Sequence, residues 1–247
     1  MINRLITFFL LSVISFNGLA NSEVALFTMT SNDGPSEFST KLEILILMTL
    51  IGFVPTLVLA CTCFTRIIIV LSLLRQAIGL QQSPPNQVLV GIAIILSTLI
   101  MKPVLDEMHI KAYTPYKEGQ IDVLTALETG SEPLKRYMIE QTEIATFENV
   151  KSIAREDENL EMKDASMTII VGAYLLSELK AAFQIGFMIF LPFIAIDLIV
   201  ASVLMSMGMM MLSPLIVSLP FKLLIFVVLD GWNLLTSALA SSFWVSS

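Results

Sequence analysis

The chain has 247 residues, of which 55% are hydrophobic and 14% charged, with a formal net charge of −7 and a mean hydropathy of +0.82. Such a composition is typical of an integral membrane protein and excludes an ordinary soluble domain. No basic patch for nucleic acid is present. One histidine and two cysteines are too few for a structural metal site, so we expect neither a metal nor a cofactor.

Residues 1–20 have the pattern of a secretory signal peptide. Arg4 supplies the positive start, residues 5–16 form an apolar core, and small side chains precede a cleavage site after Ala20. An uncleaved anchor is the alternative, but this apolar run is short for a membrane span. Residues 21–41 are then predicted to form a polar, turn-rich linker.

Residues 42–103 are predicted to form apolar helical hairpins or broken helices. One apolar run within them is closed at both ends by arginine, and a spacing of nine residues places Arg66 and Arg75 on opposite faces of one helix. The two arginines therefore cannot share an acceptor. Pro84 and Pro85 predict a turn before the next apolar run.

Residues 104–166 differ from the rest of the chain in their charge. From Val104 to Asp164 there are 14 acidic and 7 basic residues, so this segment carries the whole net charge. Its apolar spacing predicts amphipathic helices, with Gly130 and Pro133 as helix stops. A signal peptide and a large acidic loop agree on an extracytoplasmic location for this segment.

Residues 167–247 are predicted to be apolar helices around a methionine loop. The stretch 183–214 has one charge, Asp197, and is long enough to cross a hydrocarbon core, which takes roughly 20 residues. No inverted repeat supports a secondary transporter, although broken helices and buried charges are marks of that class.

The end of this stretch holds three consecutive methionines, Met209–Met211. Three neighbours on a helix cannot all face one side, and Gly208 and Pro214 beside them weaken a helix. We therefore expect a break that offers soft, adaptable side chains to one space. The other interpretation is that these methionines are packing filler or face lipid.

Ionisable residues in apolar segments are functional candidates by default, because an unpaired charge at mid-bilayer costs roughly 2.5–3.5 kcal/mol. Glu178 and Lys180 lie two positions apart, so they need separate partners. We expect Glu178 to pair with Lys222 across a boundary between two copies of the chain. The candidate buried or inter-subunit charges are Arg66, Arg75, Glu178, Lys180, Asp197 and Lys222.

Several motifs after Thr40 resemble those of one family. They are Phe64–Val70, Pro84–Leu89, Ser177–Lys180, Ala182–Phe187, Ile196–Leu198, Ala201–Met205, Gly208–Met211, Leu219–Lys222 and Asp230–Trp232. Together they resemble the FliP family of flagellar export-gate proteins, whose counterpart in virulence type III secretion systems is called SctR. The resemblance covers nearly everything after Thr40.

The resemblance implies an all-α, membrane-type protein of broken helices and helical hairpins, of which about five copies assemble into a helical oligomeric pore. It implies FliQ and FliR as partners in the gate, FlhA and FlhB as partners that handle the cargo, and unfolded rod, hook and filament subunits as the cargo. The location that it implies is the bacterial inner membrane at the flagellar basal body, with much of the chain on the periplasmic side. No enzymatic activity is expected, since the chain has no catalytic motif.

The methionine loop matches the family's gasket loop, which closes the pore. The gasket candidates are Met205, Met207, Gly208, Met209, Met210 and Met211, and the pore-lining candidates are Phe183, Gln184 and Phe187. A ring of methionines can close by contacts that are not directional and form again around a passing chain, and apolar constrictions also gate by dewetting. A small-solute or ion channel, and a scaffold without a conducting path, are the alternatives.

Overall fold

The computed structural model describes residues 45, 48–49, 52–53, 55–56, 58–80, 83–157, 159–209 and 212–243. These residues contain helices and no strand, so the all-α prediction is confirmed for them. The chain divides into two compact units after Gly52, and every helix from residue 64 onward lies in the second. The predicted signal peptide and polar linker lie outside the described residues, as do Met210 and Met211.

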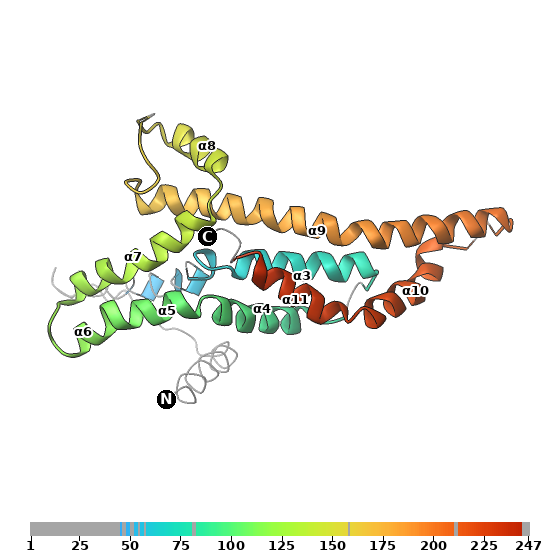
Figure 1. Cartoon of the computed structure of the whole chain (residues 1–247), viewed down its shortest axis with the longest axis horizontal. Coiled ribbons are helices and arrows are strands. Elements are labelled where there is room, and N and C mark those ends of the chain that lie inside the picture. Colours follow the sequence, from blue (N-terminus) through green and yellow to red (C-terminus); the bar gives the residue numbers. More distant parts are fainter. Residues whose placement is uncertain are drawn as a thin grey trace, which may run out of the picture. The chain divides into compact units, whose positions relative to one another are not determined.

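The helices of this unit are, in chain order, α3 (Phe64–Ile78), α4 (Asn86–Ile100), α5 (Lys102–Met108), the π-helical turn η2 (His109–Tyr113), α6 (Thr114–Lys117), α7 (Val123–Gln141), α8 (Ile144–Ala154), α9 (Met167–Ser206), α10 (Pro214–Val228) and α11 (Gly231–Ser241). The long helix α9 organises the unit, because α3, α7, α8 and α10 all pack against it. In Figure 1, α3 runs alongside the middle of α9, and α10 leads back from its far end.

Helix α9 has 40 residues and continues through Pro192. It is the one helix of the described part that is long and apolar enough to cross a membrane by itself, with a mean hydropathy of 2.5 in its most apolar window. At roughly 1.5 Å per residue it is about 60 Å long, twice the thickness of a hydrocarbon core. Only a part of α9 can therefore lie within a bilayer.

Two further helix pairs pass the same test only if each bent pair is counted as one span. The first joins α4 to the segment Lys102–Lys117 with a bend of 59°, and the second joins α10 to α11 with a bend of 65°. The apolar part of the chain therefore consists largely of broken helices, as the sequence predicts.

Helix α7 differs from the sequence prediction. The sequence predicts that Gly130 and Pro133 stop a helix, but both are buried inside this 19-residue helix. A Cβ at position 130 would lie 3.2 Å from the Cβ of Ala112 in η2, so the glycine allows the two elements to approach closely. Packing against α5, η2 and α9 stabilises α7 enough to outweigh the local preference of these two residues.

Helix α3 packs closely against α9 at Gly186. A Cβ at this position would lie 2.2 Å from Leu73 Cδ1 and 3.3 Å from Leu73 Cβ. We expect Gly186→Ala to lower the free energy of unfolding by about 1–3 kcal/mol, because Leu73 must leave its rotamer. Thermal unfolding of the purified protein in detergent measures the loss, and adding Leu73→Ala should cost little more, since the two residues are in contact.

Gly91→Ala is the matched control for this prediction. Gly91 lies inside α4, and a Cβ there would meet nothing within 4 Å. Alanine is the better helix former, so this variant should be as stable as the parent or slightly more stable. Equal losses at positions 91 and 186 would show that the α3–α9 contact is not the cause.

Candidate functional site

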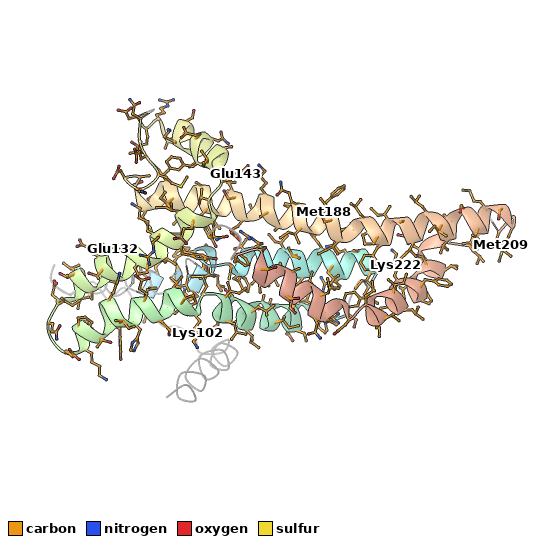
Figure 2. The ribbon with its side chains drawn as sticks, viewed as in Figure 1. Lys102, Glu132, Glu143, Met188, Met209 and Lys222 are labelled. Carbon is orange, nitrogen blue, oxygen red and sulfur yellow. The ribbon has the colours of Figure 1, made fainter. Side chains whose placement is uncertain are left out.

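A break separates α9 from α10 over residues 207–213. Gly208 has a φ of 73°, which is the left-handed conformation that favours glycine, and Pro214 begins α10 at a position where proline is well tolerated. The exposed fractions of Met205, Met207 and Met209 are 63%, 67% and 41%. Figure 2 shows Met209 at the far end of α9. The break therefore presents soft, apolar side chains outward.

The pore-lining candidates lie on an exposed face of α9. Phe183 and Phe187 are each 60% exposed and are four residues apart, so they share one side of the helix. Gln184 lies beside them and is exposed too, whereas Ala182 and Gly186 are buried. An apolar face of this size on an isolated chain indicates a surface that is covered by lipid, by a neighbouring chain or by cargo.

Beyond the break, a partly buried ion pair joins α10 to α9. Lys222 Nζ donates to Asp197 Oδ2 at 2.7 Å and to the carbonyl oxygen of Ala77 at 3.2 Å. Ser218 Oγ donates to the other carboxylate oxygen, Asp197 Oδ1, at 2.6 Å. The Ala77 carbonyl belongs to the last turn of α3, where the helix dipole favours a cation. Three helices therefore meet at Lys222, and this contact fixes α10 against α9.

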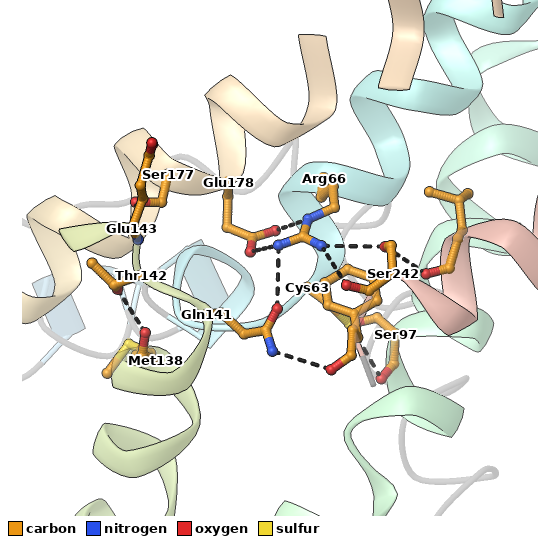
Figure 3. A network of polar contacts seen from close by, with 12 residues as sticks. Cys63, Arg66, Ser97, Met138, Gln141, Thr142, Glu143, Ser177, Glu178 and Ser242 are labelled. Carbon is orange, nitrogen blue, oxygen red and sulfur yellow. Dashed lines mark hydrogen bonds and ion pairs between the residues drawn. The ribbon is translucent and has the colours of Figure 1, made fainter. Parts of the chain in front are cut away.

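A second buried ion pair lies farther back along α9, where four elements meet (Figure 3). Arg66 Nε and Nη2 donate to the two carboxylate oxygens of Glu178 at 2.9 Å and 2.5 Å. This two-point contact is the strongest geometry for such a pair. Arg66 Nη1 also donates to Ser242 Oγ at 3.2 Å, and Nη2 donates to Gln141 Oε1 at 3.4 Å. The guanidinium carbon lies 4.0 Å from the centre of the Phe243 ring. Arg66 thus ties α3 to α9 and to the ends of α7 and α11.

The two cysteines lie just before α3 and are free and buried. Cys63 Sγ donates to Ser97 Oγ at 3.3 Å, and burial raises the pKa of the Cys63 thiol to about 11. The thiol therefore stays protonated and acts as a hydrogen-bond donor between α3 and α4.

The predicted pairing of Glu178 with Lys222 is wrong. Each of the two already forms an ion pair in the same chain, Glu178 with Arg66 and Lys222 with Asp197. The physical reason is charge balance, because a pair between Glu178 of one copy and Lys222 of another would leave Arg66 and Asp197 without their counter-charges. Within one chain, Glu178 and Asp197 are 19 residues apart on one continuous helix, or roughly 28 Å. Arg66 of α3 therefore lies beside Glu178, and Lys222 of α10 lies beside Asp197.

Lys180 and Arg75 have partners of other kinds. Lys180 Nζ donates to both carboxylate oxygens of Glu143 at 2.7 Å and 2.6 Å, and both side chains are about half exposed. This hydrogen bond lowers the pKa of the Glu143 carboxyl. Arg75 Nη1 donates to Asn86 Oδ1 at 2.6 Å. The prediction that the arginines of α3 do not share an acceptor is confirmed.

The sequence reasoning missed several residues of these two clusters. Ser218 lies four residues before Lys222 and therefore on the same side of α10, so its role could have been found from the spacing. Gln141 and Ser242 come from the ends of two other helices, and nothing in their local sequence marks them.

The described residues hold no group of three histidine, cysteine or acidic side chains that could bind a metal ion. Two hollows, of about 370 Å³ and 440 Å³, lie beside α7 and beside α8. Neither is lined by Met205, Met207 or Met209, whose side chains are exposed.

These features define a class of protein: an all-helical, membrane-type chain whose apolar helices are broken and held together by buried ion pairs. Comparison with known proteins narrows the class. The model of the FliP family matches residues 47–239, so this chain belongs to the FliP family, as the sequence motifs predict.

Individual relatives agree with this assignment. The flagellar biosynthetic protein FliP of Cereibacter sphaeroides is 45% identical over 217 residues, which is 88% of this chain and 72% of the relative. FliP of Bacillus subtilis (strain 168) is 45% identical over 213 residues, which is 86% of this chain and 96% of the relative. FliP of Pectobacterium carotovorum subsp. carotovorum is 44% identical over 219 residues, which is 89% of this chain and 85% of the relative.

Proposed function

We propose that this chain is a pore-forming subunit of the flagellar type III protein export gate. In this role it passes unfolded rod, hook and filament subunits across the inner membrane. The observation that carries the proposal is the break between α9 and α10, where Met207 and Met209 are exposed next to Met205 at the end of α9, while an ion pair holds α10 against α9. Membership of the FliP family, whose relatives are named flagellar biosynthetic proteins, supports the flagellar context.

The methionine break acts as a gasket in this proposal. A pore wide enough for an unfolded chain must still stop ions at rest. Methionine side chains from several copies close the space by contacts that have no preferred direction, and they adapt to cargo of any sequence. A dry apolar ring also excludes water, which blocks ions without a rigid plug. Gly208 supplies the backbone conformation that turns the chain at this point.

The remaining surfaces fit an assembly. About five copies of this chain, together with FliQ and FliR, would cover the exposed apolar face of α9 that carries Phe183 and Phe187. FlhA and FlhB would deliver the cargo on the cytoplasmic side. Residues 104–166 would lie on the periplasmic side at the basal body, following a cleaved signal peptide.

Deleting Met209–Met211 tests the proposal. We expect a new leak of small ions through the inner membrane, with export of hook protein partly retained, because the path remains while its seal is lost. Ion entry into cells and hook protein in the medium are measured at matched levels of assembled protein. Met188→Ala is the control, since Met188 is an exposed methionine of α9 outside the break.

The alternatives give different results in the same assay. A tight membrane with unchanged export in the deletion variant would remove these methionines from the pore, and a scaffold-only subunit predicts that outcome. A small-solute or ion channel predicts that loss of the whole chain changes solute flux and leaves flagellar export intact.

A further inference from the structure

Nearly all charges in the apolar helices are paired within the chain. In the described residues of α3, α4 and α9 to α11, three cations each form an ion pair with a carboxylate. The pairs are Arg66–Glu178, Lys222–Asp197 and Lys180–Glu143. Three ionisable side chains of these helices and of the turns beside them form no ion pair among the described residues, namely Arg75, Lys102 and Asp230. Lys102 is exposed to solvent, whereas Arg75 is partly buried, so Arg75 is the cation that lacks a counter-charge, and Asp230 has the opposite sign.

Arg75 is held by neutral groups only. It lies in the last turn of α3, and its Nη1 donates to Asn86 Oδ1 at 2.6 Å and to the carbonyl oxygen of Pro84 at 3.1 Å. Its Nε is buried without an acceptor. These contacts orient the guanidinium and do not neutralise it, so a carboxylate that reaches Nη2 would supply the missing charge.

Asp230 is an exposed carboxylate on an apolar surface. It lies at the 65° bend between α10 and α11, with a φ of 50°. Its Oδ2 accepts a hydrogen bond from Asn233 Nδ2 at 2.6 Å. The preceding residues Val227, Val228 and Leu229 are 73%, 74% and 60% exposed. A fixed carboxylate therefore stands beside an uncovered apolar patch, which is the composition of an interface.

We propose that Asp230 of one copy pairs with Arg75 of the next, so that the α10–α11 bend docks on the α3–α4 turn of a neighbouring chain. This inference rests on the proposed homo-oligomer and names one of its contacts. A second copy is the partner because it carries the complementary unpaired charge, which is Arg75 for Asp230 and Asp230 for Arg75. A head-to-tail interface repeated around the assembly then pairs both charges in every internal copy.

The arrangement of the helices agrees with this contact. In Figure 1, the end of α3 and the junction of α10 with α11 lie at a similar level along α9. Copies related by a rotation about an axis parallel to α9 therefore bring these two places together without a large shift. The buried pairs at Glu178 and Asp197 remain inside each chain and hold the two docking elements in position.

Cross-linking between two differently tagged full-length chains tests the contact. One chain carries Arg75→Cys and the other carries Asp230→Cys, and both are produced together in cells that contain the remaining export apparatus. Mild oxidation of membranes should give a disulfide-linked dimer that carries both tags. The native Cys61 and Cys63 are buried, so either single variant produced alone should give no dimer.

A charge exchange gives a second, independent measurement. Arg75→Glu alone or Asp230→Arg alone should lower the oligomeric fraction on the order of tenfold, because like charges then face each other across the interface. The double variant should recover most of the assembly. Lys180→Glu is a control for added negative charge, because Lys180 already pairs within its own chain.

The outcomes separate this contact from the proposed function. If the chains assemble and export, yet no two-tag dimer forms and the double variant shows no recovery, the Arg75–Asp230 contact is wrong and the export pore stands. A disulfide that forms only when both cysteines are in one chain overturns the contact as well. If the parent chain is a monomer in an active export apparatus, the homo-oligomer itself is wrong.

Discussion

Replacing Glu178 with alanine is expected to remove most of the folded protein, with a loss of about 3–5 kcal/mol in the free energy of unfolding. Glu178 is fully buried, and the Arg66 beside it is 5% exposed. Without the carboxylate, the guanidinium remains buried with only neutral acceptors and an aromatic ring around it. Protein level in membranes and thermal unfolding in detergent both measure the loss.

The same cluster explains why the effect should extend beyond two helices. Arg66 also binds Ser242 and Gln141 and lies against Phe243, so it anchors the end of α11 and the end of α7. If the unpaired guanidinium moves toward water, its contacts with Ser242, Gln141 and Phe243 are lost. We therefore expect amide hydrogen exchange to rise in α11 as well as in α9 of the Glu178→Ala variant.

Two comparisons isolate the cause. Lys180→Ala lies half a turn away on the same helix and breaks an ion pair that is about half exposed, so it should have little effect. The double variant Arg66→Met with Glu178→Leu removes both charges and keeps apolar volume, and it should recover much of the stability. Similar losses in Glu178→Ala and Lys180→Ala would show that burial of the pair is not what matters.

The sequence predicts those structural features that depend on the conformational preferences of single residues. The methionine break depends on Gly208, which has a left-handed backbone, and on Pro214, which starts a helix, and both effects belong to the residue itself. In α7 the local rule fails, because contacts with distant segments stabilise a helix through Gly130 and Pro133. Local chemistry therefore gives the position of the break and not the length of α7.

Charge partners could be predicted only in part. The sequence shows that Glu178 and Lys180 need different partners, and the structure agrees. It does not show which helix lies beside each part of α9, so the sequence predicts Glu178 as the partner of Lys222, whereas the structure has Asp197. The partner of Lys222 depends on how α3, α9 and α10 pack together. This packing brings Lys222 next to Ala77, which is 145 positions away in the sequence.

Asp197→Ala is the second substitution with a large expected effect, and it acts next to the methionine break. The side chain of Lys222 is 6% exposed, so its ammonium would keep only the Ala77 carbonyl and lose its counter-charge. We expect a loss of about 3–5 kcal/mol in the free energy of unfolding, concentrated where α10 packs against α9. Faster amide hydrogen exchange in α10 than in α3 would locate it.

Loss of the Lys222–Asp197 ion pair should also change how tightly the export gate is sealed. Because Lys222 and Asp197 fix α10 behind the methionine break, releasing them should let ions leak through the inner membrane even though Met209–Met211 are intact. Ser218→Ala is the matched control, since it removes one hydrogen bond to the same carboxylate and should cost only about 1 kcal/mol. The double variant Asp197→Asn with Lys222→Met removes both charges and should restore both α10 and the seal. A tight membrane in Asp197→Ala, at a matched level of assembled protein, would show that the ion pair stabilises the chain without positioning the gasket.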